Sequence, residues 1–152
     1  ILHGQSIMKQ TPHISVITVV YQAEKLVAKT LQSINAQTIR SHIESVVIDG
    51  GSTDRTMELV STLQREGDVC ISERDQGIYD AMNKGIDAAS GEIITFLTAD
   101  DFYIKADVLN LVSEAFEDRI DYLYGNLFNE EIPYLYKQND KINRLTYELD
   151  NK

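Results

Sequence analysis

The sequence predicts an α/β protein with an open, mostly parallel sheet and helices on both faces. Two observations lead to this fold class. Short, β-branched apolar runs alternate along the chain with amphipathic stretches of helical period. The loops between them are short, as is typical of βαβ units. A length of 152 residues suits one domain with a substantial core.

The first half of the chain contains two predicted strand–helix units. Ile14–Val20 is short, uncharged and β-branched, so we expect a buried strand there. Apolar residues at helical spacing then predict a helix over 26–34. Val46–Ile48 is the second predicted buried strand, and the turn cluster Asp49–Asp54 separates it from a predicted helix over 57–63.

The second half continues the alternation. Val69–Ser72 is a shorter predicted strand, followed by the polar loop Glu73–Gly77 and a predicted helix over 78–89. Glu92–Leu97 is the fourth predicted strand, and apolar residues at helical spacing predict a helix over 109–116.

Helix ends are predicted from capping residues. Ser52 or Thr53 is expected to cap the second helix, and Gly67 to end it. Gly91 is expected to close the third helix. Asp54 is expected to serve the first turn of the second helix through the helix dipole and capping.

The pattern weakens toward the C-terminus. Asp121–Tyr124 is the fifth expected strand, and Tyr134–Tyr136 is a candidate edge strand. Residues 1–12 are expected to be an N-terminal tail, with Met8 a candidate natural start. The predicted domain therefore occupies residues 13–128.

Composition excludes several classes of function. The net charge of −10 argues against a nucleic-acid-binding surface, which needs a basic patch. A phosphate-bearing ligand would then be held by a cation, by backbone N–H groups or by a single arginine. The lone Cys70 excludes an internal disulfide, and a buried structural thiol is favoured over a nucleophile. These features favour a reducing cytoplasm.

The pair Asp100-Asp101 follows the fourth predicted strand, where two adjacent carboxylates are costly to hold together. A divalent cation would remove that cost, whereas a solvated turn with the second aspartate near a helix start is the alternative. Polar loops also follow the first two strands, at Tyr21–Glu24 and Asp49–Asp54. Because parallel strands share one carboxyl edge, the three loops can form one crevice. This convergence favours a metal–nucleotide site.

Asp49 ends a buried strand directly before Gly50 and Gly51, which permit positive φ and a close approach of ligand to backbone. Its carboxylate can accept a hydrogen bond from a nucleobase or a ribose hydroxyl, although plain turn chemistry is an equal alternative. In the next strand-end loop, Arg74 could hold a phosphate and Asp75 a sugar or base, or both could be solvated.

Two common nucleotide-binding motifs are absent from the sequence, and Lys84 has a structural explanation. The chain has no Walker-type phosphate loop and no dinucleotide-binding glycine fingerprint, which argues against a usual nucleoside triphosphatase or NAD enzyme. Lys84, inside the third predicted helix, is expected on a solvated helix face.

Four segments stand in a particular order and spacing: Ile14–Gln22, Val47–Asp54, Ser72–Gly85 and Gly91–Asp101. Together they resemble the nucleotide-sugar-binding half of family 2 glycosyltransferases, which have the GT-A (Rossmann-like) fold. The resemblance covers roughly residues 13–126, including Tyr124-Gly125-Asn126. The run Asp75–Gly85 is similar to the bacterial branch that builds cell-surface polysaccharides.

The resemblance implies roles for particular residues. Asp49 matches the base-contacting acidic residue, and the backbone of 19–21 with Glu24 matches the first nucleotide-binding loop. Asp101 is the main candidate ligand for Mn²⁺ or Mg²⁺, and Asp100 would contact ribose or a metal-bound water. In full, the nucleotide-sugar-binding candidates are Val19, Tyr21, Glu24, Asp49, Arg74, Asp75 and Asp100, and the metal candidates are Asp101 and Asp100.

The chain also departs from the family pattern. Thr98 and Gly50 stand where many members have an aspartate. Thr98 leaves fewer carboxylate ligands for the metal, and Gly50 leaves base recognition mainly to Asp49. In the family, the acceptor region and catalytic base lie later in the chain. Residues 129–152 are therefore expected to be the incomplete start of an acceptor region, with the base beyond Lys152. The only late acidic candidates before the tail, Glu130 and Glu131, fit that role poorly.

The expected function is inverting transfer of a sugar from a UDP- or GDP-type donor to a saccharide or lipid-linked acceptor. The fragment itself is expected to bind donor without transferring it, in the cytoplasm or at the inner face of the membrane. Two alternatives stay open: a sugar-phosphate nucleotidyltransferase-like enzyme, and a non-catalytic interaction domain. The first would need a glycine-rich, basic N-terminal loop, which Tyr21–Lys25 is not.

Overall fold

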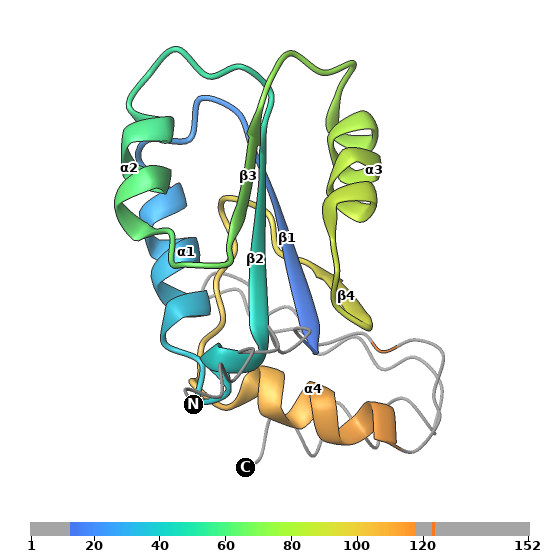
Figure 1. Cartoon of the computed structure of the whole chain (residues 1–152). Coiled ribbons are helices and arrows are strands. Elements are labelled where there is room, and N and C mark those ends of the chain that lie inside the picture. The colour runs from blue at the N-terminus through green and yellow to red at the C-terminus, as the bar shows by residue number, and fades with distance from the viewer. Residues whose placement is uncertain (1–12, 118–122, 124–152) are drawn as a thin grey trace, which may run out of the picture.

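Four parallel strands form the sheet, in the order β3-β2-β1-β4, in the computed structural model, which describes residues 13–117 and 123 (Figure 1). β1 and β2 pair along their whole length, from Ile14 opposite Ile43 to Val20 opposite Asp49. The open parallel sheet that the sequence predicts is therefore confirmed. The strands are β1 (Ile14–Val20), β2 (Ile43–Asp49), β3 (Val69–Ser72) and β4 (Ile93–Phe96).

Helices cover both faces of the sheet, as predicted. α1 and α2 lie on one face and α3 lies on the other, while α4 lies near the end at which β1 and β2 begin (Figure 1). None of the described helices is long and apolar enough to cross a membrane. The helices are α1 (Val27–Asn35), α2 (Thr56–Leu63), α3 (Ile78–Ala88) and α4 (Val108–Glu117), with a 3-10 turn, η1 (Arg40–His42).

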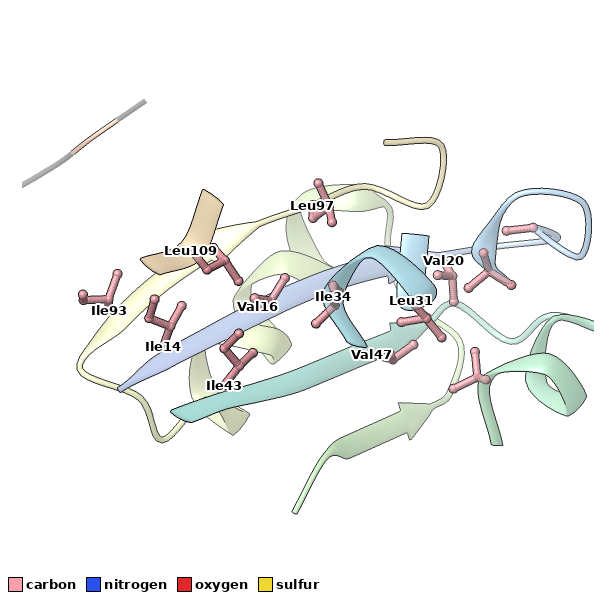
Figure 2. Close-up of a cluster of buried hydrophobic side chains, with 13 residues drawn as sticks. Ile14, Val16, Val20, Leu31, Ile34, Ile43, Val47, Ile93, Leu97 and Leu109 are labelled. Carbon is pink, nitrogen blue, oxygen red and sulfur yellow. The ribbon is translucent and has the colours of Figure 1, made fainter. Parts of the chain in front are cut away.

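The central strands are buried on both faces, because side chains alternate along each strand and helices cover both sides. On the α1 side, Val16 packs in a cluster with Leu31 of α1 and Leu109 of α4 (Figure 2). On the α3 side, Ile17 packs in a second cluster with Ala81. The core thus holds the strand ends in fixed positions beneath the loops.

β2 begins at Ile43 rather than at the predicted Val46. The three added residues include Glu44, which is only 7 % exposed. Its carboxylate accepts the hydroxyl hydrogens of Ser15 at 2.6 Å and Ser90 at 2.8 Å. Those partners make a charged residue compatible with a buried strand.

The predicted cap of α2 by Ser52 or Thr53 is wrong, because α2 begins later, at Thr56. Asp54 takes that place instead: its Oδ1 atom accepts the backbone N–H of Thr56 at 3.0 Å, as expected for a residue that serves the first turn. Gly67 does not end the helix either. It lies in the turn before β3, with a φ of 93° that a glycine adopts without strain. Similarly, α3 ends before the predicted closing glycine.

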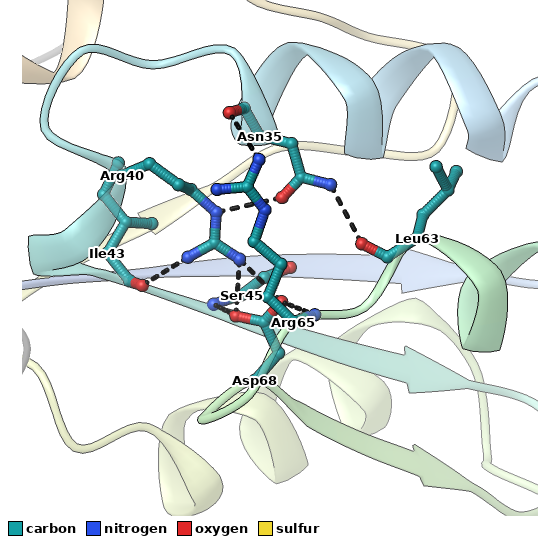
Figure 3. Close-up of polar contacts among 7 residues, drawn as sticks. All are labelled: Asn35, Arg40, Ile43, Ser45, Leu63, Arg65 and Asp68. Carbon is teal, nitrogen blue, oxygen red and sulfur yellow. Dashed lines mark hydrogen bonds and ion pairs between the residues drawn. The ribbon is translucent and has the colours of Figure 1, made fainter.

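A buried ion pair ties α1 and η1 to the turn before β3 (Figure 3). Nη2 of Arg40 lies 2.6 Å from Oδ2 of Asp68, and the two side chains are 10 % and 3 % exposed. The same carboxylate accepts the backbone N–H groups of Ser45 and Arg65, and Nε of Arg40 donates to Oδ1 of Asn35 at 2.9 Å. This cluster fixes the end of the sheet at which the strands begin.

Several expected features lie outside the described residues; of these features, only Leu123 is described. They are the tail 1–12, the strands at Asp121–Tyr124 and Tyr134–Tyr136, the acidic pair Glu130 and Glu131, and the region 129–152.

Candidate functional site

Asp49 is the last residue of β2 and is completely buried. Its Oδ2 atom accepts the hydroxyl hydrogen of Ser72 at 2.6 Å and the backbone N–H of Ser52 at 3.0 Å. Its Oδ1 atom takes only the longer contact to the same N–H, at 3.2 Å. A carboxylate has about four acceptor positions, so Asp49 is held in place and keeps unused acceptor capacity.

Three loops meet at Gly50, directly after Asp49. A Cβ built on Gly50 would lie 2.7 Å from Oδ2 of Asp75, in the loop after β3, and 3.4 Å from Cδ2 of Tyr21, in the loop after β1. Gly50 therefore leaves the space that lets these loops come together. The predicted residues Tyr21, Asp49 and Asp75 thus lie around one point.

Arg74 joins this group through Gly51. Gly51 has a φ of 88°, and a Cβ built there would lie 3.4 Å from Cγ of Arg74. The Arg74 side chain is exposed, so its guanidinium is available to an anion at the edge of the sheet. Val19 differs from these residues, because its side chain packs against the α3-side cluster.

Gln22 is a site residue that the sequence interpretation missed. Its side-chain Nε2 donates to the hydroxyl of Thr53 at 3.0 Å, and its Oε1 accepts the backbone N–H of Thr53 at 2.9 Å and of Asp54 at 3.2 Å. Its own backbone N–H donates to Oγ of Ser52 at 2.8 Å. Gln22 has a φ of 49°, unusual for a residue with a side chain, and such strain is often found near functional sites. No sequence pattern signals this clamp.

Glu24, in the loop between β1 and α1, contacts the residues just before α2. Its Oε2 atom accepts the backbone N–H of Arg55 at 3.1 Å, and its own N–H donates to Oδ2 of Asp54 at 3.1 Å. Desolvation is the largest single influence on the pKa of Asp54 and raises it, but the hydrogen bonds from Thr56 and from the Glu24 backbone together outweigh it and lower that pKa. Glu24 thus fastens the first loop to the second.

The turn Thr98–Asp101 brings both predicted metal ligands to one hydroxyl. Oγ1 of Thr98 lies 2.8 Å from Oδ1 of Asp100 and 2.8 Å from Oδ2 of Asp101. A hydroxyl has a single hydrogen and can donate to only one of the two oxygens at a time. The two carboxylates therefore share one donor, an oxygen-rich arrangement that fits a hard cation such as Mg²⁺ or Mn²⁺. Within residues 13–117, no group of three or more acidic, histidine or cysteine side chains is placed to hold a metal.

This turn is anchored to α1. The buried hydroxyl of Thr30 lies 2.8 Å from the carbonyl oxygen of Ala99 and 2.7 Å from that of Asp101. One helical turn later, Oγ of Ser33 accepts the backbone N–H of Tyr103 at 3.1 Å. Backbone carbonyl groups thus anchor this turn to α1, whereas Asp49 is held by Ser52 in the loop after β2 and by Ser72 at the end of β3.

Lys84 lies at the surface of α3, as expected, but its ammonium group is paired rather than free in solvent. Its side chain is only 24 % exposed, and Nζ lies 2.8 Å from Oε1 of Glu73 and 3.3 Å from Oδ2 of Asp80. Cys70 is partly buried in β3 as a free thiol, in line with a structural role.

The sequence profile described as "Glycosyl transferase family 2" matches residues 15–151. The chain is 39 % identical, over 108 residues, to an uncharacterized glycosyltransferase of Mycobacterium tuberculosis, covering 71 % of this chain and 41 % of that protein. It is 36 % identical, over 121 residues, to a PGL/p-HBAD biosynthesis glycosyltransferase of Mycobacterium bovis, covering 76 % of this chain and 47 % of that protein. The chain therefore spans less than half the length of these relatives.

Solved structures have the same fold. A mannosyltransferase, PcManGT from Pyrobaculum calidifontis, in complex with GDP-Man and Mn²⁺, matches with a TM-score of 0.62 and 29 % identity over 68 % of this chain and 32 % of its own. S. aureus TarS 1-349 in complex with UDP-GlcNAc matches with a TM-score of 0.64 and 25 % identity over 80 % of this chain and 37 % of its own. The parallel sheet with helices on both faces is the part that these proteins share with the chain.

Proposed function

Because this chain belongs to glycosyl transferase family 2, we propose that it serves the inverting transfer of a sugar from a nucleotide-diphosphate donor to an acceptor hydroxyl, in synthesis of a cell-surface polysaccharide. One observation carries the proposal for the donor. Tyr21, Asp49, Arg74 and Asp75 come from three different loops and lie around Gly50 and Gly51 at one edge of the sheet. Ligands of open α/β sheets bind at this edge.

The nucleoside would bind at the Asp49 end of this crevice. Asp49 offers a fixed, buried acceptor for an N–H group of a base, and fixed acceptors discriminate between donors because a mismatch leaves a buried group unpaired. Tyr21 is 66 % exposed and lies beside Gly50, so its ring offers a flat apolar surface to a base. The two side chains together favour a nucleotide over a simple sugar phosphate.

The diphosphate would bind toward the turn Thr98–Asp101, which follows β4 on the far side of β1 from Asp49. On the β3 side of Asp49, Arg74 supplies a planar cation suited to an anionic group of the donor. Asp101 and Asp100 are the residues that would hold Mn²⁺ or Mg²⁺, with the Thr98 hydroxyl between them. When bound, such a cation offsets the negative charge that develops on the leaving diphosphate. The Mn²⁺ and GDP-Man in the PcManGT complex support this assignment.

The acceptor is proposed to be a saccharide or a lipid-linked acceptor, used in the cytoplasm or at the inner face of the membrane. The role in PGL/p-HBAD biosynthesis named for the Mycobacterium bovis relative supports a biosynthetic glycosyltransferase. The ligands of the solved neighbours support either a UDP- or a GDP-type donor.

Isothermal titration calorimetry tests the proposal with UDP and GDP, each with and without Mn²⁺. We expect one of the two nucleotides to bind in a metal-dependent manner. Absence of binding by both nucleotides in the presence of Mn²⁺ would overturn the proposal for this chain. Metal-independent binding would retain the nucleotide site and overturn the cation assignment.

A further inference from the structure

The side chain of Lys84 reaches from α3 back to the loop Glu73–Gly77. Its Nζ atom donates to the backbone carbonyl oxygen of Arg74 at 3.2 Å, in addition to its contacts with Glu73 at 2.8 Å and Asp80 at 3.3 Å. An ammonium group has three N–H donors. The three acceptors match that number, and two of them lie in the loop rather than in the helix.

We propose that Lys84 is a positioning residue for donor binding, which holds the loop Glu73–Gly77 in the shape that faces the crevice. This inference rests on the proposed function, because Arg74 and Asp75 of that loop are the residues that would meet the donor.

Asp80 extends the restraint along the loop. Its Oδ2 atom, which faces Lys84, also accepts the backbone N–H of Gln76 at 3.0 Å. Within the loop, Oδ1 of Asp75 accepts the backbone N–H of Gly77 at 2.9 Å. The ammonium group and these two carboxylates therefore restrain every part of the loop from Glu73 to the start of α3.

The loop needs this restraint because it lies close against the second strand-end loop. Oδ2 of Asp75 fills the space where Gly50 would carry a Cβ, and Arg74 packs along Gly51. Holding the loop before the ligand arrives avoids the entropy cost of ordering its side chains on binding. A neutral side chain at position 84 would also leave Glu73 and Asp80 as two unpaired negative charges beside a crevice that receives a diphosphate.

The charge state of Lys84 supports a permanent restraint. The hydrogen bond to Glu73 is the main cause that raises the pKa of Lys84 above its ordinary value, with a further contribution from Asp80. The side chain is therefore an ammonium throughout the neutral range.

An ordinary helix-stabilising pair is the competing explanation, since Asp80 and Lys84 are spaced i, i+4. That role predicts a small loss of helix stability when Lys84 is changed, with no specific effect on the loop. The bond to the Arg74 carbonyl predicts the opposite pattern: a loosened loop on an unchanged fold.

Two measurements on K84M separate these explanations. Hydrogen exchange should become faster at the amides of Gln76 and Gly77, while amides in β2, which report global unfolding, exchange as in the wild type. Titration with UDP and GDP in the presence of Mn²⁺ should show binding weakened by about tenfold, the effect of roughly 1.4 kcal/mol of added ordering cost. K84R, which retains the charge, should recover part of the affinity, and D87N, an exposed charge change on the same helix, should retain all of it.

The outcomes distinguish this inference from the proposed function. Failure of the wild-type chain to bind either nucleotide overturns the proposed function and, with it, a role for Lys84 in donor binding. If the wild-type chain binds and K84M binds equally well, only the Lys84 inference fails. Unchanged exchange at Gln76 and Gly77 in K84M overturns the restraint on the loop in either case.

Discussion

Ser72 and Asp49 face each other across the carboxyl ends of β3 and β2, with the hydroxyl of Ser72 donating to Oδ2 of Asp49 at 2.6 Å. The two residues are paired in the register of the parallel strands, so the sheet itself sets this contact. A buried carboxylate at a strand end is costly without such donors. The candidate base-recognition residue is therefore prepared by the fold before any ligand binds.

Ser72→Ala should weaken both the fold and nucleotide binding. Loss of a hydrogen bond to a buried charged group costs about 1–3 kcal/mol, so the free energy of unfolding should fall by that amount in urea denaturation. Nucleotide binding, measured by calorimetry, should weaken because the Asp49 carboxylate is no longer held. Ser72→Thr retains the hydroxyl and is the matched control. Equal loss in the two variants would show that the hydroxyl is not responsible.

Cys70 provides a probe of the Asp49 charge. Burial raises the pKa of the Cys70 thiol, and the negative charge of Asp49 raises it further. The rate of iodoacetamide labelling should therefore reach its midpoint above the ordinary thiol pKa of about 8.5. Asp49→Asn removes the charge and should shift the midpoint to lower pH, whereas Asp87→Asn should not. A midpoint that is unaffected by Asp49→Asn would contradict this electrostatic link.

Much of the fold follows from local sequence patterns. Ile14–Val20 is apolar, β-branched and uncharged, so the central strand can be identified without any partner. The start of β2 could not be identified in this way, because Glu44 is charged. Its burial depends on hydrogen bonds from Ser15 and Ser90, which lie 29 and 46 residues away. Boundaries that depend on distant hydrogen-bond partners are not encoded in a local pattern.

In the candidate site too, some residues can be predicted from local sequence and others depend on distant segments. Asp49 and Asp75 could be predicted because chemistry-bearing residues directly follow apolar strands, and topology brings strand ends together. The contacts of Gln22 and Lys84 could not be predicted from the sequence. Their roles depend on the shape of loops contributed by other segments, and a polar residue in a loop or on a helix face has an ordinary solvated explanation.

Gly50→Ala should act mainly on nucleotide binding, whereas Gly91→Ala should act mainly on stability. At Gly50 the new methyl group would meet the end of the Asp75 side chain at 2.7 Å, which can shift, so nucleotide binding should weaken while the fold loses less than about 1 kcal/mol. At Gly91 it would meet the backbone nitrogen of Ser15 at 2.6 Å, inside the sheet, and cost about 1–3 kcal/mol. Thermal unfolding and calorimetry of both variants test the contrast. Equal stability losses would contradict it.

Asp68→Asn should destabilise the protein without altering the donor site. Asp68 and Arg40 are almost completely buried, and loss of one charge leaves the other uncompensated, at a cost of about 3 kcal/mol. Urea denaturation measures the loss, and nucleotide affinity under folding conditions should be unchanged because the pair lies at the opposite end of the sheet. The exposed pair Arg55–Glu58 provides the control: Glu58→Gln should change stability far less. Similar losses in both variants would show that burial does not set the cost.

Asp101→Ala should abolish the dependence of nucleotide binding on Mn²⁺. Asp101 and Asp100 both direct an oxygen at the Thr98 hydroxyl, so loss of one carboxylate leaves too few oxygen ligands for a divalent cation. The ratio of dissociation constants with and without Mn²⁺ isolates this effect from general loss of affinity. Asp101→Asn tests charge at constant shape and should behave like the alanine variant, because a neutral amide binds the cation weakly. Asp87→Ala should leave the ratio unchanged. A wild-type ratio in Asp101→Ala would refute the assignment of Asp101 as a metal ligand.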